Sequence, residues 1–328
     1  MLDNETLRRR GEAVARENRE PARRLILIYS GVLALLTLGI NGLYLLLDSK
    51  IGGTGGLDGL GLRSVLQTLQ NVLNYGNMIF GPVWSAGFLY AMVTMVRGTQ
   101  PRPAHLLEGF RRFGRVLGYM AFQFLLMVAL LTAAVYLGAL IFTFSPMGTK
   151  FAELLGPVLS DPNLIAADGT INMALIPAEA MEAAALPMAL LVAAVFLPLY
   201  TWVSYGFRMA LYLVVDGPVG GVRAHFLSRQ LMRGHKWQLL KLDLSFWWYY
   251  ALLALTAVVG YLDVILGLMG IAVPINATVL YFVTMVAYLA LQMAVVLWKK
   301  CPVDAAYTLA FESIAHPEPE QALADTNS

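Results

Sequence analysis

Long apolar runs separated by short polar segments dominate the pattern along the chain. A hydrocarbon core of about 30 Å needs about 20 apolar residues in a helix. Six stretches meet this requirement and are predicted to be membrane-spanning helices. They are Leu25–Leu47, a longer stretch ending at Val96, Val116–Phe144, Ala185–Val215, Phe246–Gly270 and Ala277–Trp298. The pattern therefore predicts an all-α, polytopic membrane helix bundle.

The composition supports this fold class and excludes several others. Of the 328 residues, 58% are hydrophobic and 13% are charged, whereas a soluble domain has about 25% charged residues. A soluble enzyme and a disordered protein are therefore excluded. The formal net charge of +2 is too balanced for electrostatic binding of nucleic acid. A single cysteine excludes a disulfide framework and a multi-thiolate metal site.

The distribution of Lys and Arg predicts the orientation. Twenty of the 23 fall in segments on one side of the predicted spans, and only Lys50, Arg63 and Lys150 fall on the other. Basic loops stay in the cytoplasm, so both termini are predicted to be cytoplasmic. The expected organisation is a cytoplasmic amphipathic segment over 1–24, a transmembrane domain over 25–300 and a cytoplasmic tail over 301–328 that is disordered at its end. The transmembrane domain includes a large outer loop over 146–184.

Two predicted cytoplasmic loops resemble each other. Residues 104–107 read AHLL and residues 224–227 read AHFL, at a constant offset of 120. Each is expected to form an amphipathic helix in the membrane interface, which we call an elbow, with basic side chains toward anionic headgroups. The alternative is that these side chains only anchor the loop. The basic residues assigned to the elbows are Arg111, Arg112, Arg115, Arg229, Arg233 and Lys236.

The second elbow carries a more specific signal. Residues 228–237 read SRQLMRGHKW and residues 240–246 read LKLDLSF. This resembles the S-x-x-L-M-(K/R)-G-x-K and L-x-L-S-F words of the uncharacterised bacterial family called domain of unknown function 975. The resemblance implies a bacterial inner-membrane protein of about six helices and no known activity. More distantly, the layout is similar to the membrane domain of some glycerophosphodiester phosphodiesterases, without their catalytic domain.

Polar side chains within the apolar spans mark two candidate sites, because such side chains are costly in lipid. The inner site comprises Gln123, Tyr205, Arg208 and Gln292. The outer site comprises Asn41, Gln70, Asn74, Asn77, Asp263, Tyr281 and Thr284. Arg208 either binds an anionic group bidentately or extends to the inner phosphates. The outer residues form either a cation or proton site or hydrogen bonds that join helices.

No catalytic or metal-ligand pattern is visible, so we expect neither an enzyme nor a cofactor. Three functions stay open. The first is a small-solute or lipid transporter, or an accessory permease subunit, without its own ATPase. The second is a non-catalytic scaffold, lipid sensor or partner-binding protein, and the third is a membrane enzyme. The expected partners are membrane lipids with anionic headgroups at the cytoplasmic face, a second copy of the chain or another membrane protein.

Overall fold

The computed structural model describes residues 3–51, 57–161, 175–269 and 277–316, and these residues form helices joined by short connections, without strands. The end of the predicted tail and the middle of the predicted outer loop lie outside the described residues. The chain divides into two compact units. Unit 1 contains Met1–Met120 and Phe207–Ser328, and unit 2 contains Ala121–Gly206.

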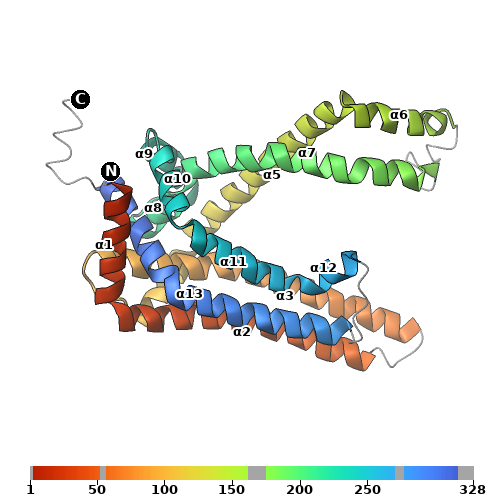
Figure 1. The fold of residues 1–328 in the computed structure, drawn as a ribbon. Helices are drawn as coiled ribbons and strands as arrows, with labels where there is room; N and C mark the ends of the chain where they lie inside the picture. Colours follow the sequence, from red (N-terminus) through yellow and green to blue (C-terminus); the bar gives the residue numbers. More distant parts are fainter. Residues whose placement is uncertain (1–2, 52–56, 162–174, 270–276, 317–328) are drawn as a thin grey trace. The chain divides into compact units, whose positions relative to one another are not determined.

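Unit 1 contains most of the helices. Its long members are α2 (Arg19–Ile51), α3 (Leu57–Val96) and α13 (Ala277–Ala315). The shorter ones are α1 (Asn4–Glu17), η1 (Pro103–Leu107), α4 (Glu108–Arg111), α8 (Ala210–Asp216), α9 (Gly221–Leu231), α10 (Lys236–Ser245), α11 (Trp247–Gly260) and α12 (Leu262–Leu268). The first turns of α5 (Phe113–Thr143) also belong to it. Helices α2 and α11 both pack against α13, and α1 packs against its C-terminal part (Figure 1).

Unit 2 is formed by the rest of α5, by α6 (Pro146–Leu159) and by α7 (Ala178–Phe207). Helix α6 begins in a defined way, because the Ser145 hydroxyl accepts a hydrogen bond from the Gly148 amide at 3.1 Å. Gly138 lets α5 and α7 approach closely, since a Cβ there would lie 2.9 Å from Val192. The predicted outer loop therefore starts with a helix.

Five helical stretches are long and apolar enough to cross a membrane among the described residues, and the bent pair α10–α11 would be a sixth. The long apolar helices thus follow the predicted pattern, but two predicted spans are interrupted. The fourth breaks after Phe207, and the fifth breaks at Tyr261 between α11 and α12. At the first break the Met209 amide, which leaves the helical ladder, donates to Ser228 Oγ at 3.1 Å.

A cluster of buried apolar side chains in unit 1 lies toward the predicted cytoplasmic ends of the helices. Leu25, Met92, Met95 and Leu106 are buried in one cluster that joins α2, α3 and η1. Helix α13 continues past the predicted end of the sixth span and stays buried through Phe311. Cys301 and Ala305, expected in the cytoplasmic tail, therefore form part of this core.

Helix α1, in the predicted amphipathic segment, also packs against this core through Val14 and Ala15. Leu7 and Gly11 of α1 are buried. A Cβ at Gly11 would lie 2.9 Å from both the Pro302 oxygen and the Ala306 nitrogen of α13. Glycine therefore permits the close approach of these two helices.

Both elbows are pressed against neighbouring helices. A Cβ on Gly87 of α3 would lie 1.9 Å from the Leu106 oxygen, and one on Gly221 would lie 2.1 Å from the Tyr119 nitrogen of α5. The first elbow is not one continuous helix, because α4 ends at Arg111 and α5 begins at Phe113. Leu106 is fully buried against α3 rather than lying on a free apolar face.

Candidate functional site

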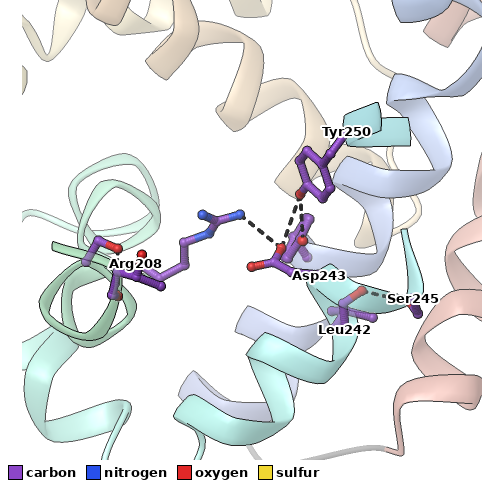
Figure 2. A network of polar contacts seen from close by, with 8 residues as sticks. Arg208, Leu242, Asp243, Ser245 and Tyr250 are labelled. Carbon is purple, nitrogen blue, oxygen red and sulfur yellow. Dashed lines mark hydrogen bonds and ion pairs between the residues drawn. The ribbon is translucent and has the colours of Figure 1, made fainter. Parts of the chain in front are cut away.

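Arg208, predicted as an inner-site residue, lies at the start of a polar network in unit 1 (Figure 2). Its Nη2 atom is 3.4 Å from Asp243 Oδ1, which also accepts a hydrogen bond from the Tyr250 hydroxyl at 3.1 Å. The Tyr250 and Tyr307 hydroxyls are 2.9 Å apart, and the Arg208 guanidinium lies 5.0 Å from the centre of the Tyr307 ring. A carboxylate and an aromatic ring together stabilise the cation.

A second charged pair lies within α13. Lys300 Nζ is 2.9 Å from Asp304 Oδ2, and the two side chains are only 21% and 23% exposed. The ammonium also lies 5.0 Å from the Phe88 ring centre and 5.7 Å from that of Tyr29. A cation in such surroundings needs a partner, because an unpaired buried charge is strongly unfavourable.

A cavity of about 420 Å³ lies between α2, α11 and α13, with Lys300 among its lining residues. Apolar side chains form part of its wall, as in most ligand sites. Its polar lining residues are Tyr29, Ser30, Thr37, Tyr249, Tyr288, Gln292 and Lys300. Gln292 is the one predicted inner-site residue that lines it. The structure thus provides a partly open cavity with hydrogen-bonding groups inside the predicted spans.

Polar positions on α2 extend this cavity toward the predicted outer side. Ser30, Thr37 and Asn41 follow one another at i, i+7 and i+11, which places them on one face of the helix. Asn41 Oδ1 accepts a hydrogen bond from the Tyr281 hydroxyl of α13 at 3.3 Å. The structure therefore brings together two residues of the predicted outer site.

Helix α13 carries a matching row of polar residues. Its members Tyr281, Tyr288, Gln292 and Lys300 recur at spacings of seven, four and eight, and so share a face. Thr284, another predicted outer residue, is buried, and its hydroxyl donates a hydrogen bond to the backbone oxygen of Tyr281 at 2.9 Å. We call the two facing rows on α2 and α13 the polar seam.

The remaining predicted outer residues lie on other helices. Gln70, Asn74 and Asn77 are on α3, where Asn74 is exposed and the other two are half-buried. Asn77 Oδ1 is buried without a hydrogen-bond partner among the described residues. Asp263 is half-buried in the first turn of α12.

The predicted inner site is divided between the units. Gln123 and Tyr205 belong to unit 2, where both are half-buried, whereas Arg208 and Gln292 belong to unit 1.

The basic residues of the first elbow contact the protein itself. Arg111 forms an ion pair with Glu108 at 2.8 Å, and this hydrogen bond raises the pKa of Arg111. The Arg112 guanidinium lies 4.6 Å from the Tyr90 ring centre, and Arg115 donates to the Gly217 oxygen. In the second elbow, Arg229 and Arg233 are exposed and Lys236 is half-buried. Binding of lipid headgroups by these residues stays a prediction.

The two elbow histidines have structural surroundings. His225 is fully buried, stacks on Tyr119 at 4.8 Å, and has Nδ1 2.9 Å from the Gly221 oxygen. His105 Nδ1 accepts a hydrogen bond from the Arg102 amide at 3.2 Å. Burial lowers the pKa of His225, and burial together with the Arg102 charge lowers the pKa of His105. Both rings are thereby favoured in the neutral form.

An ionic cluster that no sequence pattern predicts links the end of α3 with α8 and α13. Arg97 Nη1 is 2.5 Å from Asp216 Oδ1, and Nη2 is 2.8 Å from Glu312 Oε1. His316 Nε2 lies 3.0 Å from the other Asp216 oxygen. The hydrogen bond to Asp216 raises the pKa of Arg97. The partners are far apart in the chain, so no local spacing could reveal them.

The long apolar helices and the polar positions between them define the class as a multi-pass α-helical membrane protein. Residues 59–292, well over half of the chain, match the family model described as "Protein of unknown function (DUF975)". The chain belongs to this family, as its second-elbow sequence indicates. No curated protein and no solved structure matches the chain. The more distant resemblance to phosphodiesterase membrane domains is not shown.

Proposed function

We propose that this protein is a small-solute or lipid transporter, or an accessory permease subunit, in the bacterial plasma membrane with both termini in the cytoplasm. The observation that carries the proposal is the polar seam. It runs from Lys300 at the predicted inner boundary to the Asn41–Tyr281 hydrogen bond nearer the outer boundary. Polar side chains gathered inside a bundle are typical of substrate pathways.

The cavity suggests the class of ligand. Its volume of about 420 Å³ lies within the usual range for sites that hold small organic molecules. The hydroxyl and amide groups among the apolar lining side chains fit an amphipathic molecule better than a bare inorganic ion. Lys300 is already paired with Asp304, so the cavity does not demand an anionic ligand. Active transport would use an ion gradient or a separate motor chain, because no ATPase motif is visible in the sequence.

Cysteine accessibility tests whether water reaches the seam. In a Cys301→Ser background, single cysteines replace Asn41, Gln292 and, as a control, Leu35, which lies on the same helix as Asn41 but is 70% exposed on the bundle surface. Intact cells and inverted vesicles are treated with a membrane-impermeant thiol reagent. We expect labelling of Asn41→Cys from outside, labelling of Gln292→Cys from inside, and protection of Leu35→Cys. Protection of all three would mean a dry seam and would refute a transport pathway there.

A partner-binding scaffold is the second candidate, and one observation favours it. Helix α3 leaves Asn74 exposed beside Tyr75, which is 68% exposed. An asparagine facing lipid is unfavourable, whereas a neighbouring helix can hydrogen-bond to it. Disulfide crosslinking of an Asn74→Cys variant, in the same cysteine-free background, should then capture a second copy or another membrane protein. Absence of any crosslinked species would argue against this face as an interface.

A further inference from the structure

A second cavity of about 650 Å³ lies in unit 1, where α1 and α2 meet α11 and α13. Its charged lining residues are Glu12, Arg16, Arg19, Arg23 and Lys299. Four cations and one carboxylate give it a formal net charge of +3. We call this cavity the basic groove, and none of its charged residues belongs to the predicted elbows.

The cations of the basic groove are poorly neutralised by the protein. Arg16 lies 3.7 Å from Glu12, but its side chain is 82% exposed, so this pair contributes little. Arg19 and Arg23 are exposed and form no ion pair with any described residue. Arg19 is also the first residue of α2, where the positive end of the helix dipole disfavours a cation. An anion in the groove would offset both effects.

The rest of the lining indicates that the anion is attached to an apolar molecule. Trp248 and Trp298 line the groove, and Lys299 Nζ lies 5.1 and 4.5 Å from their ring centres. Tryptophan rings and lysines of this kind settle at the headgroup level of a membrane. Ile26 and Leu297 provide apolar walls in the same groove. A free inorganic anion would leave these apolar surfaces without a contact.

We propose that the basic groove binds the headgroup of an anionic phospholipid from the cytoplasmic leaflet. Arg19, Arg23 and Lys299 contact the phosphate, while the first part of the acyl chains packs along Ile26 and Leu297. This assignment does not depend on transport, because a bound lipid can serve a transporter and a scaffold alike.

Lipid binding to the purified full chain in detergent tests the proposal. Native mass spectrometry measures the affinity for phosphatidylglycerol, with phosphatidylcholine as the zwitterionic comparison. The test variant is Arg19→Gln/Arg23→Gln, and the matched control is Arg8→Gln/Arg10→Gln, which removes the same charge from exposed positions of α1 that belong neither to the groove nor to the elbows. Loss of charge-assisted hydrogen bonds should weaken phosphatidylglycerol binding about tenfold in the test variant. The control should stay close to the unmodified protein.

Three results would overturn the proposal. Equal weakening in both variants would show that net charge alone attracts the lipid. Equal affinity for phosphatidylcholine would remove the role of the anionic headgroup. Displacement of bound lipid by millimolar inorganic phosphate would identify a free-anion site instead. If the double variant does not fold, Lys299→Gln replaces it, with Lys241→Gln at an exposed position as its control.

Discussion

Replacing Asp304 with Asn leaves the Lys300 ammonium without its carboxylate partner inside the core of unit 1. At the observed separation of 2.9 Å and an effective dielectric constant of about 20, the attraction between the two charges is about 6 kcal/mol. Desolvation offsets part of this, and breaking a buried pair costs about 3–5 kcal/mol. The Tyr29 and Phe88 rings stay near the ammonium in the variant and continue to stabilise it, which favours the lower part of this range. We therefore expect a loss of about 3 kcal/mol of unfolding free energy.

Thermal unfolding of the purified protein in detergent measures this loss. Since 1 kcal/mol shifts the melting temperature of a larger domain by about 2–4 °C, Asp304→Asn should lower it by at least about 6 °C. The control is Glu5→Gln, which breaks a pair with Arg9 at the same four-residue spacing, but with side chains 59% and 74% exposed. Its effect should stay below about 1 kcal/mol.

The double variant Lys300→Met/Asp304→Asn separates charge from packing. With the ammonium removed, most of the lost stability should return, because no unpaired charge remains. Equal effects of Asp304→Asn and Glu5→Gln would refute the reasoning. So would a double variant as unstable as Asp304→Asn alone.

Two further predictions concern the elbows. Gly87→Ala should destabilise the protein by about 1–3 kcal/mol in the same melting assay, because its Cβ would overlap the backbone oxygen of Leu106. The control is Gly76→Ala on the same helix, which has open space around it and should cause no loss of stability. Similar melting temperatures for the two variants would contradict the packing argument. Burial lowers the pKa of His225 in the folded protein. Just below about pH 6.5 this histidine is therefore protonated more in the unfolded chain than in the folded protein. The free energy of unfolding should then fall as the pH drops below this value toward the pKa of the folded state. Melting curves between pH 7.5 and 5 should show a smaller fall for His225→Gln, and an unchanged pH dependence would exclude this histidine as a cause.

The sequence predicts the long apolar helices well, because a membrane imposes a minimum length on each of them. It does not predict the breaks at Phe207 and Tyr261. The first break is stabilised by Ser228, which is distant in the chain and satisfies the free amide of Met209. Likewise, the predicted amphipathic helix through Leu106 is not one continuous helix. The backbone of Leu106 instead packs closely against Gly87 of α3.

The candidate site could be predicted only in part. Polar residues are rare in apolar spans, so the sequence predicts site residues at Asn41, Gln292 and Tyr281. The structure places these three residues on the polar seam. The sequence does not predict Lys300 as a site residue, because a lysine next to a span boundary also serves as a topology signal. Its spacing of four from Asp304 was the available sign that the two charges could pair.

The contact between α1 and α13 has a consequence for biosynthesis. Helix α1 precedes the other described helices of unit 1 in the chain, yet the backbone against which its Gly11 packs belongs to α13, the last of them. During synthesis Gly11 therefore lacks this contact until some 300 further residues have been made. A nascent chain released before residue 302 would lack this contact, and its uncovered α1 would distinguish it from the finished protein for quality-control proteases.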